Sequence, residues 1–148
     1  MTKRAFTPAR LLLSAILALA TPAAAQELPV SPGNYWDVSA IDVVDGQDAA
    51  YIDYLATTWK RSQEFARSKG YIDGYHVLTN EYARAGEPDL YLVTIYKKWY
   101  DTAEQERQRK EYEAMMQRDQ RKLMAESGGR ATMRKLAGSM LLREWMFK

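Results

Sequence analysis

Residues 89–98, DLYLVTIYKK, carry the pattern that most strongly constrains the fold. Successive side chains of a β-strand point to opposite faces, and both faces of this segment are apolar. One face carries Tyr91, Val93 and Ile95, and the other carries Leu90, Leu92 and Tyr96. Because a strand that is apolar on both faces must be covered on both, we expect this strand to lie in the centre of a sheet.

The segments on either side of this strand alternate between strand and helix patterns. The elements expected in chain order are a strand at 34–44, a helix at 48–69, strands at 71–82 and 89–98, a helix at 101–124, a short helical turn at 130–137 and a strand at 140–147. Gly70 stands where a left-handed residue ends the first helix. Asp101, followed three residues later by Glu104, predicts the N-cap of the second helix.

This order of elements predicts an α+β, ferredoxin-like split βαβ fold. Its four-stranded antiparallel sheet has the strand order 4-1-3-2 and carries two helices on one face. The other face would expose Val, Leu, Tyr and Trp side chains over more than the few hundred Å² that soluble monomers leave open. We therefore expect two copies of the chain to pair through these faces as a homodimer.

Residues 1–25 have the features of a secretory signal peptide. Basic residues precede the apolar run 11–20, LLLSAILALA, and small residues end at Ala25, so we expect cleavage before Gln26. As a helix the apolar run reaches about 15 Å, against about 30 Å for a bilayer core, which is too short for a membrane anchor. The sequence predicts a periplasmic or secreted protein; the general secretory route is favoured, and twin-arginine export stays open as an alternative.

After cleavage the chain is expected to have one domain, 34–148, preceded by an extended arm at 26–33 that contains two prolines. Removal of the signal peptide leaves 18 basic and 19 acidic residues. This near-neutral balance gives no electrostatic basis for binding nucleic acid. The chain has no Cys and a single His, so we expect no metal site and no cofactor. No membrane span is expected after cleavage.

The chain resembles the dimeric α/β-barrel superfamily over residues 34–148. The resemblance rests on the element order, on the aromatic strand segment 35–38, YWDV, on the long helix that ends at Gly70, and on the closing segment 143–147, REWMF. It implies a dimeric barrel with a ligand cleft between the sheet and the helices. Members include small monooxygenases acting on aromatic polyketides, haem-degrading enzymes, muconolactone-type isomerases and stress-responsive proteins. The haem-degrading members use a helix-borne His, whereas His76 falls on a strand, which makes haem breakdown an unfavoured activity.

Three residues are weak candidates for proton transfer: Asp37, Tyr75 and His76. A buried Asp37 would have a raised pKa or would need a cation beside it, which Arg143 or Lys97 could supply. The alternative for Asp37 is a position at the strand end, in contact with water. His76 is the only imidazole in the chain, and the alternative is a strand histidine that only makes a structural hydrogen bond.

Three further residues, Trp36, Asn80 and Arg143, are weak candidates for ligand binding. Ten Tyr and four Trp are many for a chain of this length. Such side chains could line a cavity for a small hydrophobic or aromatic ligand, or they could fill a dimer core. The favoured function is an exported small-ligand-binding or interaction module of the cell envelope without identifiable catalytic machinery. The alternative is a cofactor-free monooxygenase or isomerase acting on a small aromatic or hydrophobic substrate.

Overall fold

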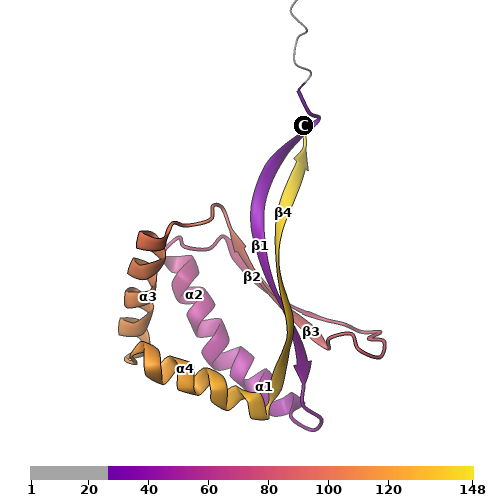
Figure 1. Cartoon of the computed structure of the whole chain (residues 1–148), viewed down its shortest axis with the longest axis vertical. Helices are drawn as coiled ribbons and strands as arrows, with labels where there is room; N and C mark the ends of the chain where they lie inside the picture. Colours follow the sequence, from indigo (N-terminus) through magenta and orange to yellow (C-terminus); the bar gives the residue numbers. More distant parts are fainter. Residues whose placement is uncertain (1–26) are drawn as a thin grey trace, which may run out of the picture.

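The computed structural model describes residues 27–148 (Figure 1), so the expected signal peptide lies outside the described residues. The elements in chain order are β1 (Val30–Val43), α1 (Asp48–Tyr54), a π-helical segment (Leu55–Trp59), α2 (Lys60–Ser68), β2 (Gly74–Thr79), β3 (Leu90–Tyr96), α3 (Thr102–Met116), α4 (Gln120–Gly129), a 3-10 turn (Arg130–Thr132) and β4 (Arg134–Phe147). The predicted α+β class is confirmed.

The four strands form one antiparallel sheet in the order β2-β3-β1-β4, which read from the β4 edge is 4-1-3-2. The strand β3 is central, in agreement with its two apolar faces. All helices lie on one side of the sheet (Figure 1). We call the side that they cover the helix face and the other side the open face.

The helix face holds the main apolar core. Ile41 and Leu90, which lie opposite each other on β1 and β3, pack with Tyr51 of α1 and Leu55 of the π-helical segment. A second cluster, made only of strand residues, lies on the open face and contains Val38, Val93 and Ile95. The core therefore joins the sheet to the first helical layer, and the open face holds a separate apolar surface.

The first helix ends as the sequence predicts. Gly70 has a φ of 71°, in the left-handed region, where the absence of a Cβ removes the steric penalty. The cap of α3 is also confirmed, because the Asp101 carboxylate accepts a hydrogen bond from the Glu104 backbone N–H at 2.9 Å.

The single helix expected at 101–124 is wrong. The chain forms two helices, α3 and α4, separated at Gln117, which has a φ of 55°. Asp119 then caps α4 by accepting a hydrogen bond from the Lys122 backbone N–H at 2.8 Å. A left-handed residue with a Cβ pays a steric cost, so the tertiary fold imposes this break and the local propensity does not.

Replacing Gln117 by Gly is expected to raise the free energy of unfolding by about 0.5–1 kcal/mol, because glycine adopts a positive φ without the Cβ clash. Gln117→Ala keeps the Cβ and should give no gain. Urea denaturation of the three proteins measures the difference. Equal stability of the Gly and Ala variants would contradict the assignment of strain to this residue.

The two long paired strands, β1 and β4, both begin earlier in the chain than the sequence predicts. β1 starts at Val30, so the second half of the expected arm 26–33 belongs to β1, and its residues 30–32 pair with the end of β4. β4 starts at Arg134 and replaces the helical turn expected at 130–137, of which only Arg130–Thr132 is helical. Gly138 lies next to a register shift in β4, where glycine within a strand is common. The paired ends of β1 and β4 extend beyond the helices (Figure 1).

Candidate functional site

A cavity of about 420 Å³ separates α2 from α3 at the end of β3. Six of its lining side chains are aromatic, namely Phe65, Tyr71, Tyr96, Trp99, Tyr100 and Tyr112. Its polar lining consists of Ser62, Gln63, Gln105, Gln108 and Arg109. Ligand cavities in proteins typically combine such an apolar lining with a few polar groups that fix orientation.

The helix α2 supplies one wall of the cavity and α3 supplies the wall opposite. Successive turns of α2 place Ser62, Phe65 and Ala66 on the side that faces the cavity. Residues at spacings of three and four share a helix face, and Gln105, Gln108, Arg109 and Tyr112 of α3 follow the same rule. The cavity is therefore the space between one face of α2 and one face of α3.

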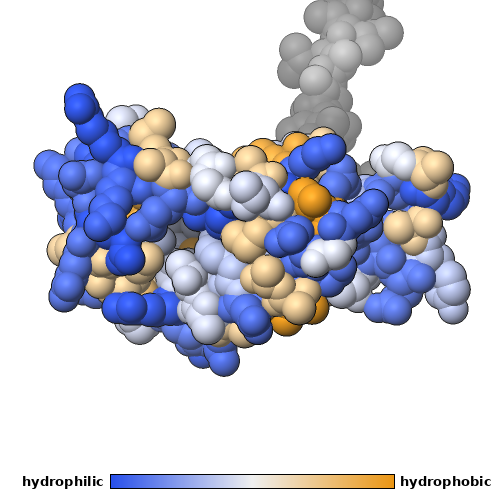
Figure 2. Space-filling view, turned by 90° about the horizontal axis from the view of Figure 1, so that it is seen from below, coloured by the Kyte–Doolittle hydropathy of each residue, from blue (hydrophilic) through white to orange (hydrophobic). Residues whose placement is uncertain are grey.

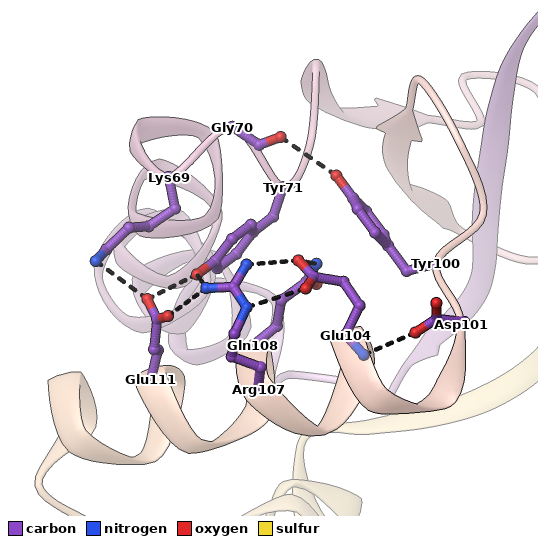
Figure 3. Close-up of polar contacts among 9 residues, drawn as sticks. All are labelled: Lys69, Gly70, Tyr71, Tyr100, Asp101, Glu104, Arg107, Gln108 and Glu111. Atoms are coloured by element: carbon purple, nitrogen blue, oxygen red, sulfur yellow. Dashed lines mark hydrogen bonds and ion pairs between the residues drawn. The ribbon is translucent and has the colours of Figure 1, made fainter.

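A network of charged residues holds α3 to the end of α2 beside this cavity (Figure 3). Arg107 donates from Nη1 to Glu111 at 2.6 Å and from Nε to Glu104 at 2.9 Å. The Tyr71 hydroxyl donates to the second oxygen of Glu111 at 2.6 Å. The same oxygen forms an ion pair with the Lys69 ammonium group at 3.1 Å. Tyr71 thus links the network to the cavity that its ring lines.

Two further hydrogen bonds of cavity residues belong to this region. The Tyr100 hydroxyl donates to the Gly70 carbonyl at 3.3 Å, and Gln108 donates to Glu104 at 3.0 Å. Figure 3 shows the Tyr100 hydroxyl meeting the Gly70 carbonyl, while the Tyr71 ring points toward Arg107 and Glu111 on α3. The turn that ends α2 is therefore tied to α3 through side chains of the cavity wall.

The pKa of Glu104 is lowered to about 2, mainly by its hydrogen bonds with Arg107 and Gln108. A depressed folded-state pKa means that the carboxylate stabilises the fold above its unfolded pKa. This contribution is lost as the pH falls through about 2. Glu104 therefore stays ionised, and able to accept from Arg107 and Gln108, throughout the neutral and mildly acidic range.

Asp37 lies on the helix face of β1 and does not itself line the cavity. It is directly opposite Thr94, whose hydroxyl donates to Gln63 of the cavity lining at 3.4 Å. Burial raises the pKa of the Asp37 carboxyl. Burial and the charge of Asp37 together raise the pKa of Tyr96 to about 12. Asp37 and the cavity-lining Tyr96 therefore interact electrostatically.

The cations that the sequence suggested for Asp37 have other partners. The Arg143 guanidinium lies over the Tyr35 ring, 3.8 Å from its centroid. Lys97 forms an ion pair with Asp73 at 3.0 Å. Among residues 27–148, no cation forms an ion pair with Asp37.

The structure separates the three candidates for proton transfer. Tyr75 lies on the helix face, where its hydroxyl bonds to Glu64 and its ring meets Trp59 edge-on at 5.3 Å. His76 lies on the open face, stacks on Trp36 at 6.2 Å between ring centroids, and is exposed. Asp37 and Tyr75 thus share a face, and His76 is on the opposite side of the sheet.

The candidates for ligand binding are also dispersed, and none of them lines the cavity. Trp36 is on the open face, and Arg143 is on β4 beside Tyr35. Asn80 follows β2 and donates from its side chain to the Pro88 carbonyl at 3.2 Å, a structural role in the hairpin turn. The number of aromatic residues was the only sequence signal for the cavity, because its walls come from separate segments of the chain.

A second recess of about 350 Å³ lies between the π-helical segment and the edge strand β2. Its lining is almost entirely apolar and includes Ile52, Leu55, Trp59 and Val77. It has fewer aromatic rings and polar groups than the cavity between α2 and α3. We therefore take the larger cavity as the candidate functional site.

Within 27–148, no group of three or more His, Asp or Glu side chains is placed to hold a metal ion. In the same residues, no helix has both the length and the apolar character needed to cross a bilayer. The chain matches no protein-family model and no curated protein sequence.

Proposed function

We propose that this protein binds a small, flat, largely apolar ligand in the cavity between α2 and α3. The observation that carries this proposal is an open cavity of about 420 Å³ lined by six aromatic side chains, with amide groups of Gln63, Gln105 and Gln108 on the same walls. Cavities that hold small ligands measure about 300–1,000 Å³. The aromatic rings offer apolar contact, and the amides offer hydrogen bonds to a ligand edge.

Binding to this cavity can be tested with N-phenyl-1-naphthylamine, a neutral dye whose fluorescence rises in an apolar site. We expect one dye molecule to bind per chain. In Ala66→Phe the new ring fills part of the cavity, so the affinity for the dye should fall about tenfold or more, which corresponds to a loss of about 1.4 kcal/mol of binding free energy. Ala66 lines the cavity on α2.

Ala114→Phe is the matched control, since Ala114 is exposed on α3 and does not line the cavity. It should bind the dye as the unsubstituted protein does. Dye binding that is equal in the two variants, or absent from the unsubstituted protein, would refute the proposed site.

The ligand-binding unit is further proposed to be a homodimer that pairs through the open face. Side chains on this face include Trp36, Val38, Leu78, Tyr91, Met140 and Leu142. Leu78, Met140 and Leu142 are exposed in the single chain. Homodimer interfaces are more apolar than other protein surfaces, and a second copy presents the same apolar side chains. The helical side is different, because Figure 2 shows mostly hydrophilic residues at its left, where Figure 1 places α3.

We also propose that the protein acts after export, in the periplasm or outside the cell, because residues 1–25 have the sequence of a signal peptide. The alternative activity, a cofactor-free monooxygenase or isomerase, would rely on Asp37 near Tyr96. General acid–base catalysis needs a poised group within hydrogen-bond reach of its substrate. Binding without catalysis is favoured because His76 lies on the open face, away from Asp37.

A further inference from the structure

The aromatic cavity between α2 and α3 has the chemistry of a site for cations. The face of an aromatic ring carries negative electrostatic potential and attracts ammonium and guanidinium groups. Three of the six rings already hold a side-chain cation over one face. These pairs are Lys69 over Phe65, Arg107 over Tyr71 and Lys98 over Tyr100, at 5.6, 5.4 and 5.1 Å from the ring centroids.

The charged groups at the cavity are balanced unequally. Arg109 is the cation in the cavity lining, and it is neutralised by ion pairs with Glu106 at 2.5 Å and with Glu113. Asp37 is the acid on the sheet side, and no ion pair joins it to a residue of the described chain. The cation in the lining is therefore compensated, whereas Asp37, which lies behind the lining residues, has no ion-pair partner among residues 27–148. Lys98, over the Tyr100 ring, likewise forms no ion pair within these residues.

The position of Asp37 relative to the cavity follows from its two neighbours on β3. Thr94, directly across the strand pair, bonds to Gln63, which lines the cavity. Tyr96, the diagonal neighbour two residues further along β3, lines the cavity and feels the charge of Asp37. Asp37 thus lies next to two contacts with the cavity wall on the same face of the sheet.

We infer that the ligand of this cavity is an organic cation, an amine or quaternary ammonium group on an apolar frame, whose charge is held by the aromatic rings and balanced by Asp37. This inference rests on the proposed binding function and names the ligand class for the same site. A cation over an aromatic ring gains about 0.5–2 kcal/mol, and more where water is excluded. A cation beside a partly buried carboxylate that has no ion-pair partner stabilises the charged form of the carboxylate and so adds to the binding free energy.

The test compares phenyltrimethylammonium with tert-butylbenzene, which has the same shape and no charge, by displacement of N-phenyl-1-naphthylamine. We expect the cation to bind about tenfold or more tightly than the neutral compound, since about 1.4 kcal/mol gives that ratio. Asp37→Asn should lower the affinity for the cation by about the same factor and leave the affinity for the neutral compound unchanged.

Asp42→Asn is the matched control, because Asp42 lies on the same strand but on the open face; it should change neither affinity. Because burial raises the pKa of Asp37, its charge is unfavourable to the fold, and Asp37→Asn should fold at least as well as the unsubstituted chain. Tighter binding of the neutral compound, or no effect of Asp37→Asn on the cation, would overturn the inference and leave the proposed binding site standing. If the dye binds and neither compound displaces it, the inference is overturned; if the dye itself does not bind, the binding function fails.

Discussion

The Ile41→Ala variant is expected to unfold with a free energy about 3 kcal/mol lower than that of the unsubstituted chain, the usual cost of removing a fully buried isoleucine side chain. The Ile41 side chain is 1% exposed and packs in the core between the sheet and the helices. Its neighbours Tyr51 and Leu55 come from the helical layer, and Leu90 comes from β3. The substitution therefore leaves a cavity where α1 joins the sheet.

Ile52→Ala makes the same chemical change one residue after Tyr51, where the side chain is 60% exposed. It should cost less than about 1 kcal/mol, because little apolar area returns to water. Urea denaturation at one fixed protein concentration measures both variants, since the stability of a dimer depends on concentration. Similar losses at the two positions would show that the core does not lie where the structure places it.

The sheet could be predicted because its residues follow the period of two. Residues 89–98, apolar on both faces of the strand, predicted a central position for β3, and the observed sheet has β3 between β2 and β1. The break at Gln117 could not be predicted in this way, because a left-handed glutamine has no sequence signature. Asp119 was the available signal, since an aspartate before a run of helix-forming residues is a typical N-cap.

Less of the candidate site than of the fold could be predicted from the sequence. Tyr75 and His76 are adjacent in a strand and so must point to opposite faces; this rule alone predicts that they cannot serve one cavity. The aromatic lining is spread over α2, the start of the following loop, the end of β3 and α3. These residues meet only after α3 has been placed against the end of α2, which depends on contacts between separate segments, such as the ion pair of Lys69 with Glu111 and the hydrogen bond from Tyr71 to Glu111, rather than on a local pattern.

The second large effect is expected for the pairing of two chains. Leu142→Lys should convert a dimer into a monomer in native mass spectrometry of the protein purified from the periplasm. An interface with two-fold symmetry contains each substituted position twice, so one substitution buries two unpaired ammonium groups, each at a cost of several kcal/mol. The subunit in the same spectrum should have the mass of a chain that begins at Gln26.

Leu141→Lys is a closely matched control for this experiment. Leu141 and Leu142 are neighbours in β4 and are each 49% exposed, but Leu142 lies opposite Trp36 on the open face and Leu141 lies opposite Asp37 on the helix face. Only the open face is proposed to meet the second copy, so Leu141→Lys should remain a dimer. If both variants stay dimeric, the chains pair through another surface. If the unsubstituted protein is a monomer at micromolar concentration, the apolar surface around Trp36 is left without its proposed partner and the dimer is refuted.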